Sequence, residues 1–279
     1  MKRTWLIMGV SSGFGYEITK LLLESGNTVI GTVRNTEKVK TFIDNYPHAF
    51  DCRILDVTDV DGVHALVKTV FDKYGKIDVV VSNAGYGLFG AAEEFNDVEI
   101  NKIIATNLTG SIMLIHDSIP YMRKQGYGRI IQISSYGGQV AFPGNSMYHA
   151  TKWGIEGFCE SVSKEVADFG IGITIVEPGG ARTEFRYGSA KVTSLTKVYD
   201  GTPTHAFLKM LDKNNRLAPG NPTEMAKRII ESVEVNPAPL RMVLGAAALK
   251  NTIEALNQRI SAFEKQTELA SSTDYKEGE

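Results

Sequence analysis

Residues 9–15 read GVSSGFG and follow the apolar stretch TWLIMG at residues 4–9. Gly9, Gly13 and Gly15 therefore stand where a predicted strand ends and a helical pattern begins. Glycine permits a tight turn and a close approach of backbone to a ligand, and the N–H groups that open a helix bind phosphate. At the first strand–helix junction of an α/β chain, this loop predicts a dinucleotide site. A tight turn without a ligand is the alternative.

The pattern around this loop repeats along the chain. Short apolar runs rich in Ile and Val predict further strands at 28–33, 50–55, 77–83, 128–134 and 172–178. They alternate with helical patterns around 15–25, 59–74, 97–123 and 146–169. Strands that are apolar on both faces and alternate with helices are typical of a parallel sheet covered on both sides. The fold class predicted is α/β, a doubly wound Rossmann-type parallel sheet.

The rhythm changes after Pro178, where residues 179–222 are rich in Gly, Ser, Thr and Pro. A helix near 222–235, a strand at 240–245 and a helix at 246–270 follow. No linker divides the chain, so we predict a single dinucleotide-binding catalytic domain over 1–279. Residues 183–222 are interpreted as a substrate lid, with a plain surface loop as the alternative.

The C-terminal helix carries apolar residues at helical spacing, which predicts that one of its faces is buried. It could cover the pocket or join a subunit interface. The apolar positions are Leu249, Ile253, Leu256, Ile260 and Phe263.

Composition excludes several classes of protein. The 279 residues include 43% hydrophobic and 22% charged residues, enough for a sizeable core, and the net charge of −2 gives no reason to expect nucleic acid as a partner. Cys52 and Cys159 lie in separate apolar stretches, which favours two reduced, buried thiols. No metal-ligand spacing occurs, so no metal is predicted. The apolar run near the N-terminus is short and ends in the glycine loop, and no segment could span a bilayer, so we expect no membrane partner and a cytoplasmic protein.

The end of the second strand bears on the choice of cofactor. An NAD-binding unit usually carries a carboxylate there, but this chain has Val33 followed by Arg34. A guanidinium offers a planar set of donors that fits the 2′-phosphate of NADP. The sequence therefore predicts NADP(H), although Arg34 could instead be a solvated surface residue.

A tyrosine and a lysine in YHATK, residues 148–152, suggest catalysis. Tyr148 and Lys152 share a helix face, and Ser135 ends a predicted strand thirteen residues upstream, at the sheet edge where ligands bind. The lysine ammonium and the positive ring of the oxidised cofactor would lower the tyrosine pKa from about 10, and the serine could donate to a carbonyl oxygen. The same spacing at Tyr16–Lys20 and Tyr187–Lys191 lacks this setting. We predict hydride transfer between nicotinamide and a carbonyl or secondary alcohol, with Tyr148 as the acid/base.

These motifs together resemble those of the short-chain dehydrogenase/reductase family, over about residues 4 to 245. GVSSGFG matches its cofactor loop, LDV at 55–57 its adenine-reading segment, and EPGGART at 177–183 its nicotinamide segment. SNAG at 82–85, TNLTG at 106–110 and ISSYGG at 133–138 also match, in family order. Within the family, the chain resembles the NADP-preferring branch that includes hydroxysteroid and retinol dehydrogenases.

The resemblance implies roles for individual residues. Lys152 would also bind the nicotinamide ribose, and Asn107 would hold a water in a proton relay, although a mid-helix Asn could simply brace the fold. The cofactor contacts implied are Gly9, Ser11, Ser12, Gly13, Phe14, Gly15, Arg34, Asp56, Val57, Asn83, Ala84, Gly85, Tyr148, Lys152, Pro178, Gly179 and Thr183. The chain departs from the family at Met8, where Thr is usual, and at Ser82, where Asn is usual, which puts the local hydrogen bonding in doubt.

The partner is expected to be a small carbonyl or alcohol, and the resemblance implies a homodimer or homotetramer formed through the helices at 97–123 and 146–169. Candidate pocket residues are Tyr136, Phe142, Met147 and Phe185, with Tyr187, Tyr199 and Phe207 on the lid. One alternative is a catalytically silent NADP(H) sensor of the same fold. Another is a sugar-nucleotide epimerase or dehydratase, whose different glycine loop and larger C-terminal domain are not present here.

Overall fold

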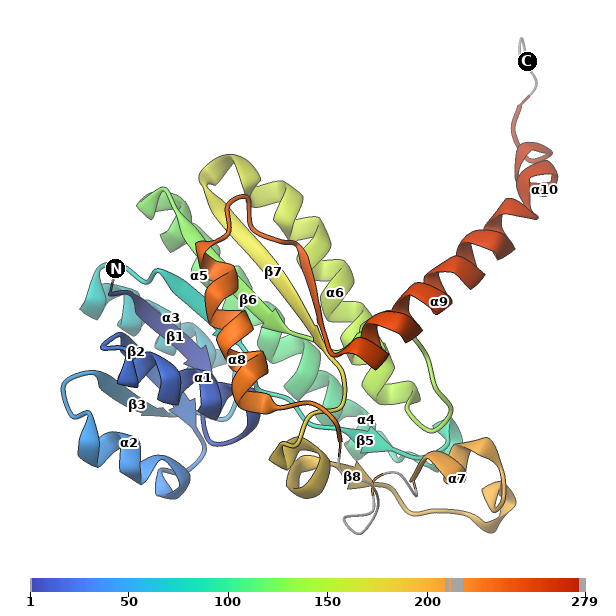
Figure 1. Ribbon diagram of the computed structural model, residues 1–279, viewed down its shortest axis with the longest axis horizontal. Helices are drawn as coiled ribbons and strands as arrows, with labels where there is room; N and C mark the ends of the chain where they lie inside the picture. The colour runs from blue at the N-terminus through green and yellow to red at the C-terminus, as the bar shows by residue number, and fades with distance from the viewer. Residues whose placement is uncertain (1, 209–210, 212–217, 276–279) are drawn as a thin grey trace.

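A seven-stranded parallel sheet forms the centre of the protein, as the computed structural model of residues 2–208, 211 and 218–275 shows (Figure 1). The strand order is β3-β2-β1-β4-β6-β7-β9. The first strands extend the sheet from β1 to β3, and the later strands are added on the opposite side of β1. This confirms the doubly wound fold. The strands are β1 (Thr4–Met8), β2 (Thr28–Val33), β3 (Phe50–Ile54), β4 (Val79–Ser82), β6 (Gly128–Ile133), β7 (Ile171–Pro178) and β9 (Arg241–Leu244).

The central strands β1, β2 and β4 are largely apolar on both faces because each face packs against helices. In β1, Trp5 and Ile7 point into one hydrophobic core, whereas Leu6 and Met8 point into the other, and all four are buried. Side chains that alternate between two cores explain why the strands are continuous apolar runs rather than alternating patterns.

Helices cover both faces of the sheet (Figure 1). On one face lie α3 (Val60–Tyr74), α5 (Gly110–Gln125) and α6 (Ser146–Val166), which pack side by side. On the other face lie α1 (Gly13–Glu24), α2 (Lys40–Asn45) and α8 (Pro222–Glu231). The sequence did not predict α2, a six-residue helix with a single buried residue, Phe42, because so short a segment carries almost no periodic signal.

The helix predicted at 97–123 is interrupted. It consists of α4 (Asp97–Ile104), a π-helical turn at Ala105–Thr109 and then α5. Turns of this kind occur mostly as single insertions within longer helices and often at functional sites. The turn contains Asn107, which is buried.

The segment predicted as a lid is not wholly irregular. It contains β8 (Lys191–Val192), which pairs with β5 (Leu88–Phe89) in a separate two-stranded sheet, and α7 (Pro203–Leu208). Residues 209–210 and 212–217 of the predicted lid, and the side chain of Tyr187, lie outside the described part of the chain. The described portion of the segment therefore carries its own short elements, which the sequence did not predict.

The C-terminal helix departs from the prediction. α9 (Ala246–Glu264) and α10 (Thr267–Ser271) project from the body (Figure 1), and only Ala248 and Thr252 of α9 are buried. The apolar stripe expected to be buried is exposed, with Ile260 54% and Phe263 68% accessible. Helical spacing predicts that a helix has an apolar face, but it does not say whether the same chain covers that face.

Both cysteines are free thiols, as predicted, although Cys52 is only half-buried. Among the described helices, none combines the length and the apolar character needed to cross a bilayer.

Candidate active site

A cavity of about 600 Å³ opens at the carboxyl ends of the central strands. It receives residues from the glycine loop, the ends of β2, β4, β6 and β7, the start of α6, and the segment after β7. The predicted site residues along its wall are Gly9, Ser11, Ser12, Gly13, Phe14, Arg34, Asp56, Val57, Asn83, Ala84, Gly85, Ser135, Tyr148, Lys152, Pro178, Gly179 and Thr183. Gly15 and Asn107 lie behind the wall and do not line the cavity.

The glycine loop has the backbone shape that the sequence predicts. Gly9 and Gly13 both adopt positive φ angles, +92° and +60°, which residues other than glycine rarely adopt. Gly15 is required for a different reason, since a Cβ there would lie 2.0 Å from the Gly9 carbonyl oxygen. α1 therefore starts against the loop, and its first N–H groups and positive dipole end face the cavity.

Hydrogen bonds hold this loop from two neighbouring strands. Thr32 on β2 accepts from the Gly9 N–H at 2.9 Å, and Asn83 after β4 donates its side-chain amide to the Gly9 carbonyl at 2.6 Å. The Met8 side chain packs into the core, and its backbone carbonyl accepts from the N–H groups of Asn83 and Ala84 at 3.2 and 2.9 Å. The hydroxyl of Ser82 has no partner among the described residues. The loop thus keeps its support, supplied by Thr32 and Asn83, despite both departures from the family pattern.

The end of the cavity next to β2 and β3 has the features expected for the adenosine half of a dinucleotide. Arg34 follows β2 on the cavity wall and is exposed. Asp56 accepts hydrogen bonds from the backbone and hydroxyl of Thr58, at 3.0 and 2.8 Å, and the backbone bond is the main reason its pKa is lowered. The positive charge of Arg34 acts in the same direction. An anion near Arg34 would meet a guanidinium that has no hydrogen-bond partner within the described part of the chain, and a carboxylate that Thr58 already satisfies.

Ser135, Tyr148 and Lys152 meet at the centre of the cavity wall. All three are buried, and the Ser135 hydroxyl lies close enough to the Tyr148 phenol to lower its pKa. The Lys152 ammonium lies 5.8 Å from the centre of the Tyr148 ring and donates to the Ile133 carbonyl at 3.0 Å. The end of β6 and the first turns of α6 therefore bring a hydroxyl, a phenol and an ammonium onto one face of the cavity.

Burial controls the ionisation of this group. Burial raises the pKa of the Tyr148 phenol to about 12, whereas the neighbouring Ser135 hydroxyl acts to lower this pKa. Burial also lowers the pKa of Lys152 to about 8, with Glu156 acting in the opposite direction. From protein groups alone, the expected fall in the tyrosine pKa does not occur, because desolvation of the phenolate outweighs its stabilisation. The neutral phenol is thus the resting form and is ready to donate a proton.

Asn107 is fixed entirely by the protein. Its side-chain oxygen accepts from the Tyr86 N–H at 3.0 Å, and its amide donates to the Tyr86 carbonyl at 2.8 Å and to Thr151 at 3.3 Å. This pins the segment after β4 to α6. Both side-chain N–H groups of Asn107 are occupied, so a water could contact this residue only by donating to Oδ1 or through the backbone.

Two polar groups close to the catalytic residues were not predicted from the sequence, and the first of them, His149, lines the cavity. His149 hydrogen bonds through Nδ1 to the Gly137 carbonyl at 2.6 Å and accepts from the Phe142 N–H at 3.2 Å, which identifies the neutral Nδ1–H tautomer. Burial lowers its pKa, in agreement with that form. Each contact joins residues 7 to 12 positions apart, and only the position of His149 beside Tyr148 could have drawn attention to it.

The second group is a buried cluster of charges. Glu156 accepts from Ser134 at 2.5 Å, from Gln139, and from Arg241 at 2.6 Å. Arg241 on β9 also binds Glu160 and Glu177, each at 2.7 Å. Glu156 is one helical turn beyond Lys152, so this cluster connects the last strand of the sheet to the loop that carries Ser135.

The substrate end of the cavity is aromatic. Tyr136, Phe142, Phe185 and Phe207 line it, as predicted, together with Phe89, which lies 6.0 Å from Tyr148 between ring centres. Met147 and Tyr199 do not line it. Met147 packs against a hydrophobic cluster, and Tyr199 donates to Glu93 on the outer side.

The fold and the site are those of a Rossmann-type dinucleotide-binding protein, and comparisons with known proteins define the family. Residues 3–191 match the family model described as short chain dehydrogenase. Oxidoreductase BOA17 of Botryotinia fuckeliana is 34% identical over 97% of this chain and 98% of its own length. The 3-ketodihydrosphingosine reductase of Bacteroides thetaiotaomicron is 32% identical over 86% and 87%. The chain belongs to the short-chain dehydrogenase family of oxidoreductases.

Solved structures agree with this assignment. A short-chain dehydrogenase from Streptomyces avermitilis superimposes with a TM-score of 0.92 and 33% identity, covering 99% of this chain and 100% of that one. ElxO with NADP bound gives a TM-score of 0.72 and 27% identity, covering 90% and 100%. The match to the first structure spans the projecting C-terminal helix as well as the sheet.

Among the described residues, no three His, Cys, Asp or Glu side chains gather as metal ligands would.

Proposed function

We propose that the protein is an NADP(H)-dependent oxidoreductase that transfers a hydride between the nicotinamide and a carbonyl or secondary alcohol. The observation that carries the proposal is the meeting of Ser135, Tyr148 and Lys152 on the wall of a cavity that also contains a glycine loop and Arg34. A hydride acceptor needs a proton donor, a donor to its oxygen and a positive charge, and these three residues supply them.

The cofactor fits the residues present. Gly9 and Gly13 leave room for a pyrophosphate at the start of α1, and Arg34 offers a fork of donors to a 2′-phosphate. Asp56 and Val57 would contact the adenine, and Pro178, Gly179 and Thr183 the nicotinamide side. The bound cofactor supplies or accepts the hydride. ElxO, a relative solved with NADP bound, supports NADP(H) rather than NAD(H).

The protein's own groups handle the proton. Ser135 donates a hydrogen bond to the carbonyl oxygen and holds it beside Tyr148. As the carbon gains the hydride, the oxygen becomes an alkoxide and takes the proton from the Tyr148 hydroxyl. Lys152, buried one helical turn away, stabilises the resulting tyrosinate. In the direction of alcohol oxidation the same proton returns to the tyrosinate.

The shape of the cavity bears on the substrate. Its aromatic end, formed by Phe89, Phe142, Phe185 and Phe207, suits a carbonyl attached to apolar groups. A relative whose name specifies reduction of a keto group on a sphingoid chain supports this class. We propose that the whole chain forms one catalytic domain, in which residues 183–222 act as the lid over this end.

The test is consumption of NADPH with a panel of ketones and aldehydes that vary in apolar size. Tyr148→Phe should reduce turnover at least about 1,000-fold, because the phenol alone donates the proton, while the Kd for NADPH stays within about twofold. Tyr136→Phe is the matched control, since it removes a neighbouring hydroxyl on the same wall, and should stay within about threefold of the parent.

Two results would overturn the proposal. One is full turnover by Tyr148→Phe. The other is tight NADPH binding without reduction of any carbonyl in the panel, which would favour the catalytically silent sensor.

A further inference from the structure

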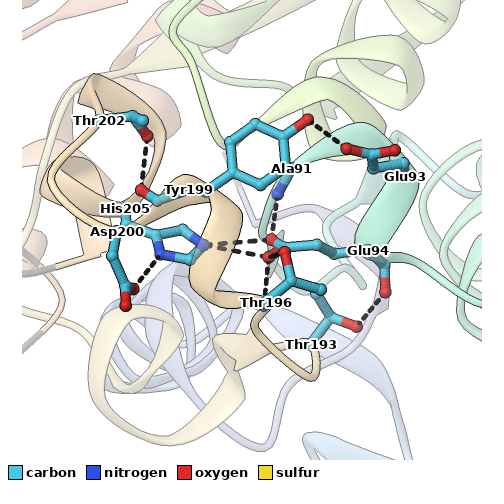
Figure 2. Close-up of polar contacts among 9 residues, drawn as sticks. All are labelled: Ala91, Glu93, Glu94, Thr193, Thr196, Tyr199, Asp200, Thr202 and His205. Atoms are coloured by element: carbon cyan, nitrogen blue, oxygen red, sulfur yellow. Dashed lines mark hydrogen bonds and ion pairs between the residues drawn. The ribbon is translucent and has the colours of Figure 1, made fainter.

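A buried carboxylate outside the catalytic group ties the lid segment to the body of the protein. Glu94 ends a 3₁₀ turn at Ala92–Glu94, and its side chain has no exposed surface. It accepts hydrogen bonds from the Ala91 N–H at 2.7 Å, the Thr196 N–H at 2.7 Å and the Thr196 hydroxyl at 3.0 Å. His205 Nε2 lies 3.1 Å from the same carboxylate (Figure 2).

The partners of Glu94 lie about 100 positions away, in the segment after β8. Besides Thr196 and His205, Thr193 donates to the Glu94 backbone carbonyl at 3.0 Å, and Tyr199 donates to Glu93 at 2.7 Å. The pairing of β5 with β8 continues this attachment. Figure 2 shows the carboxylate enclosed between the two segments. The buried part of this attachment is a cluster that we call the Glu94 anchor: Glu94 with Thr193, Thr196 and His205.

The short helix α7 connects the anchor to the aromatic end of the cavity. α7 carries both His205, which faces Glu94, and Phe207, which lines the cavity. The centre of the Phe207 ring lies 5.8 Å from the centre of the Phe89 ring, which in turn lies 6.0 Å from the centre of the Tyr148 ring. Because α7 has fewer than two turns, the position of His205 determines where Phe207 can lie.

The charge of His205 matters to this attachment. Its Nε2 faces Glu94, and its Nδ1 lies 3.3 Å from Asp200, which is 70% exposed. A neutral imidazole has one N–H and could satisfy only one of these carboxylates, whereas the imidazolium donates to both. The other titratable group against the ring is Tyr199, at 5.8 Å between ring centres.

The ionisation of Glu94 agrees with an anchor that depends on charge. Burial by itself would raise its pKa, but the hydrogen bonds from Thr196, Ala91 and His205 outweigh burial and lower the pKa to about 2. Glu94 is therefore an anion throughout the neutral range.

We propose that Glu94 and His205 are positioning residues that fix Phe207 against Phe89 and so shape the pocket for the apolar part of the substrate. The role in substrate binding rests on the proposed function. The attachment of residues 191–208 does not.

The first experiment measures hydrogen exchange by mass spectrometry, which needs no substrate. Glu94→Gln and His205→Ala should raise exchange in residues 191–208 about tenfold or more and leave the central sheet unchanged. Glu93→Gln is the matched control, because this neighbouring carboxylate makes only an exposed contact, and it should resemble the parent.

The second experiment separates binding from chemistry. With an apolar ketone, both anchor variants should raise KM about tenfold while kcat and the Kd for NADPH stay within about twofold. Phe207→Ala should give the same rise in KM without a change in exchange at 191–196. Combining Glu94→Gln with Phe207→Ala should raise KM no further, because both act through the same ring.

The outcomes are separable. Unchanged exchange in both anchor variants would overturn the anchor. Raised exchange with unchanged KM, or additive effects in the double variant, would overturn the link to the pocket. Absence of any carbonyl turnover in the parent would overturn the proposed function and leave the exchange result to decide the anchor alone. His205→Ala keeps the Thr196 and Ala91 donors to Glu94, so it tests the anchor even where Glu94→Gln does not fold.

Discussion

At the scale of single residues, the site depends on positions whose chemistry is local. Tyr148 and Lys152 are one helical turn apart, and Ser135 lies two residues beyond β6, the strand that precedes their helix. Spacing within one helix and convergence of parallel strand ends are both readable from sequence. These three side chains were therefore predictable, as was the glycine loop. The ionisation of the group was not, because it depends on burial contributed by the whole fold.

Arg34 gives the first prediction. Arg34→Ala should weaken NADPH binding by about 10- to 100-fold, since hydrogen bonds to a charged group contribute about 1.5–3 kcal/mol, and should leave the Kd for NADH within about twofold. Fluorescence titration of both cofactors measures the difference. Lys38→Ala, an exposed cation just beyond the cavity, serves as the control. Equal weakening of NADH and NADPH would show that Arg34 does not recognise the 2′-phosphate.

The second prediction concerns pH. Reduction requires the Tyr148 phenol, which keeps its proton up to a pKa of about 12, and the Lys152 ammonium, whose pKa burial lowers to about 8. As pH rises through about 8, the lysine loses its charge, so kcat/KM for ketone reduction should be flat below this pH and fall above it. Alcohol oxidation needs the tyrosinate and should instead rise with pH. A reduction profile that stays flat to pH 10 would contradict the assignment of Lys152.

At the scale of elements, the contacts that place the site join segments far apart in the sequence. Glu94 meets His205 across 111 positions, and Arg241 meets Glu156 across 85. Neither pair leaves a local pattern, because a buried ion pair looks like any two charged residues until the fold brings them together. The short strands β5 and β8 were missed for the same reason, since each is two residues long and is defined by its partner.

Arg241 gives the third prediction. It joins β9 to α6 through Glu156 and to β7 through Glu177, and these two side chains are 2% and 1% exposed. Arg241→Met would leave these carboxylates unpaired and should lower the free energy of unfolding by roughly 2–3 kcal/mol, less than a fully buried pair because 31% of the Arg241 side chain is exposed. Urea denaturation measures this. Arg228→Met, which breaks only the exposed pair with Glu231, should change stability by less than about 0.5 kcal/mol.

At the scale of the whole molecule, the sheet, its strand order and its covering helices follow from a regular alternation of patterns, and the prediction of them is confirmed. The C-terminal helix shows where that reasoning stops. Its apolar stripe was expected to be buried, yet Leu249, Ile253 and Phe263 are 47%, 49% and 68% exposed in the single chain. Amphipathicity predicts that a helix face is to be covered, but the covering surface need not belong to the same chain.

The fourth prediction follows from this exposure. We expect the protein to associate in solution, with a mass by light scattering of at least twice the 30.6 kDa of one chain. Replacing both Ile253 and Ile260 by Glu should reduce the mass if α9 contributes to the interface, whereas Gln258→Glu, on another side of α9, should not. A parent protein that measures 30.6 kDa would contradict the expected association, including the one predicted through the helices at 97–123 and 146–169.

The central claim is that a hydride passes from NADPH to a carbonyl carbon while Tyr148 supplies the proton. The most direct measurement uses NADPH that carries deuterium at nicotinamide C4, on the transferred face, together with the best ketone of the panel. Mass spectrometry then determines the deuterium content of the alcohol formed. We predict one deuterium on the carbinol carbon with the parent protein and no product above background with Tyr148→Phe. An alcohol without deuterium, or labelled product formed at the parent rate by Tyr148→Phe, would contradict the account.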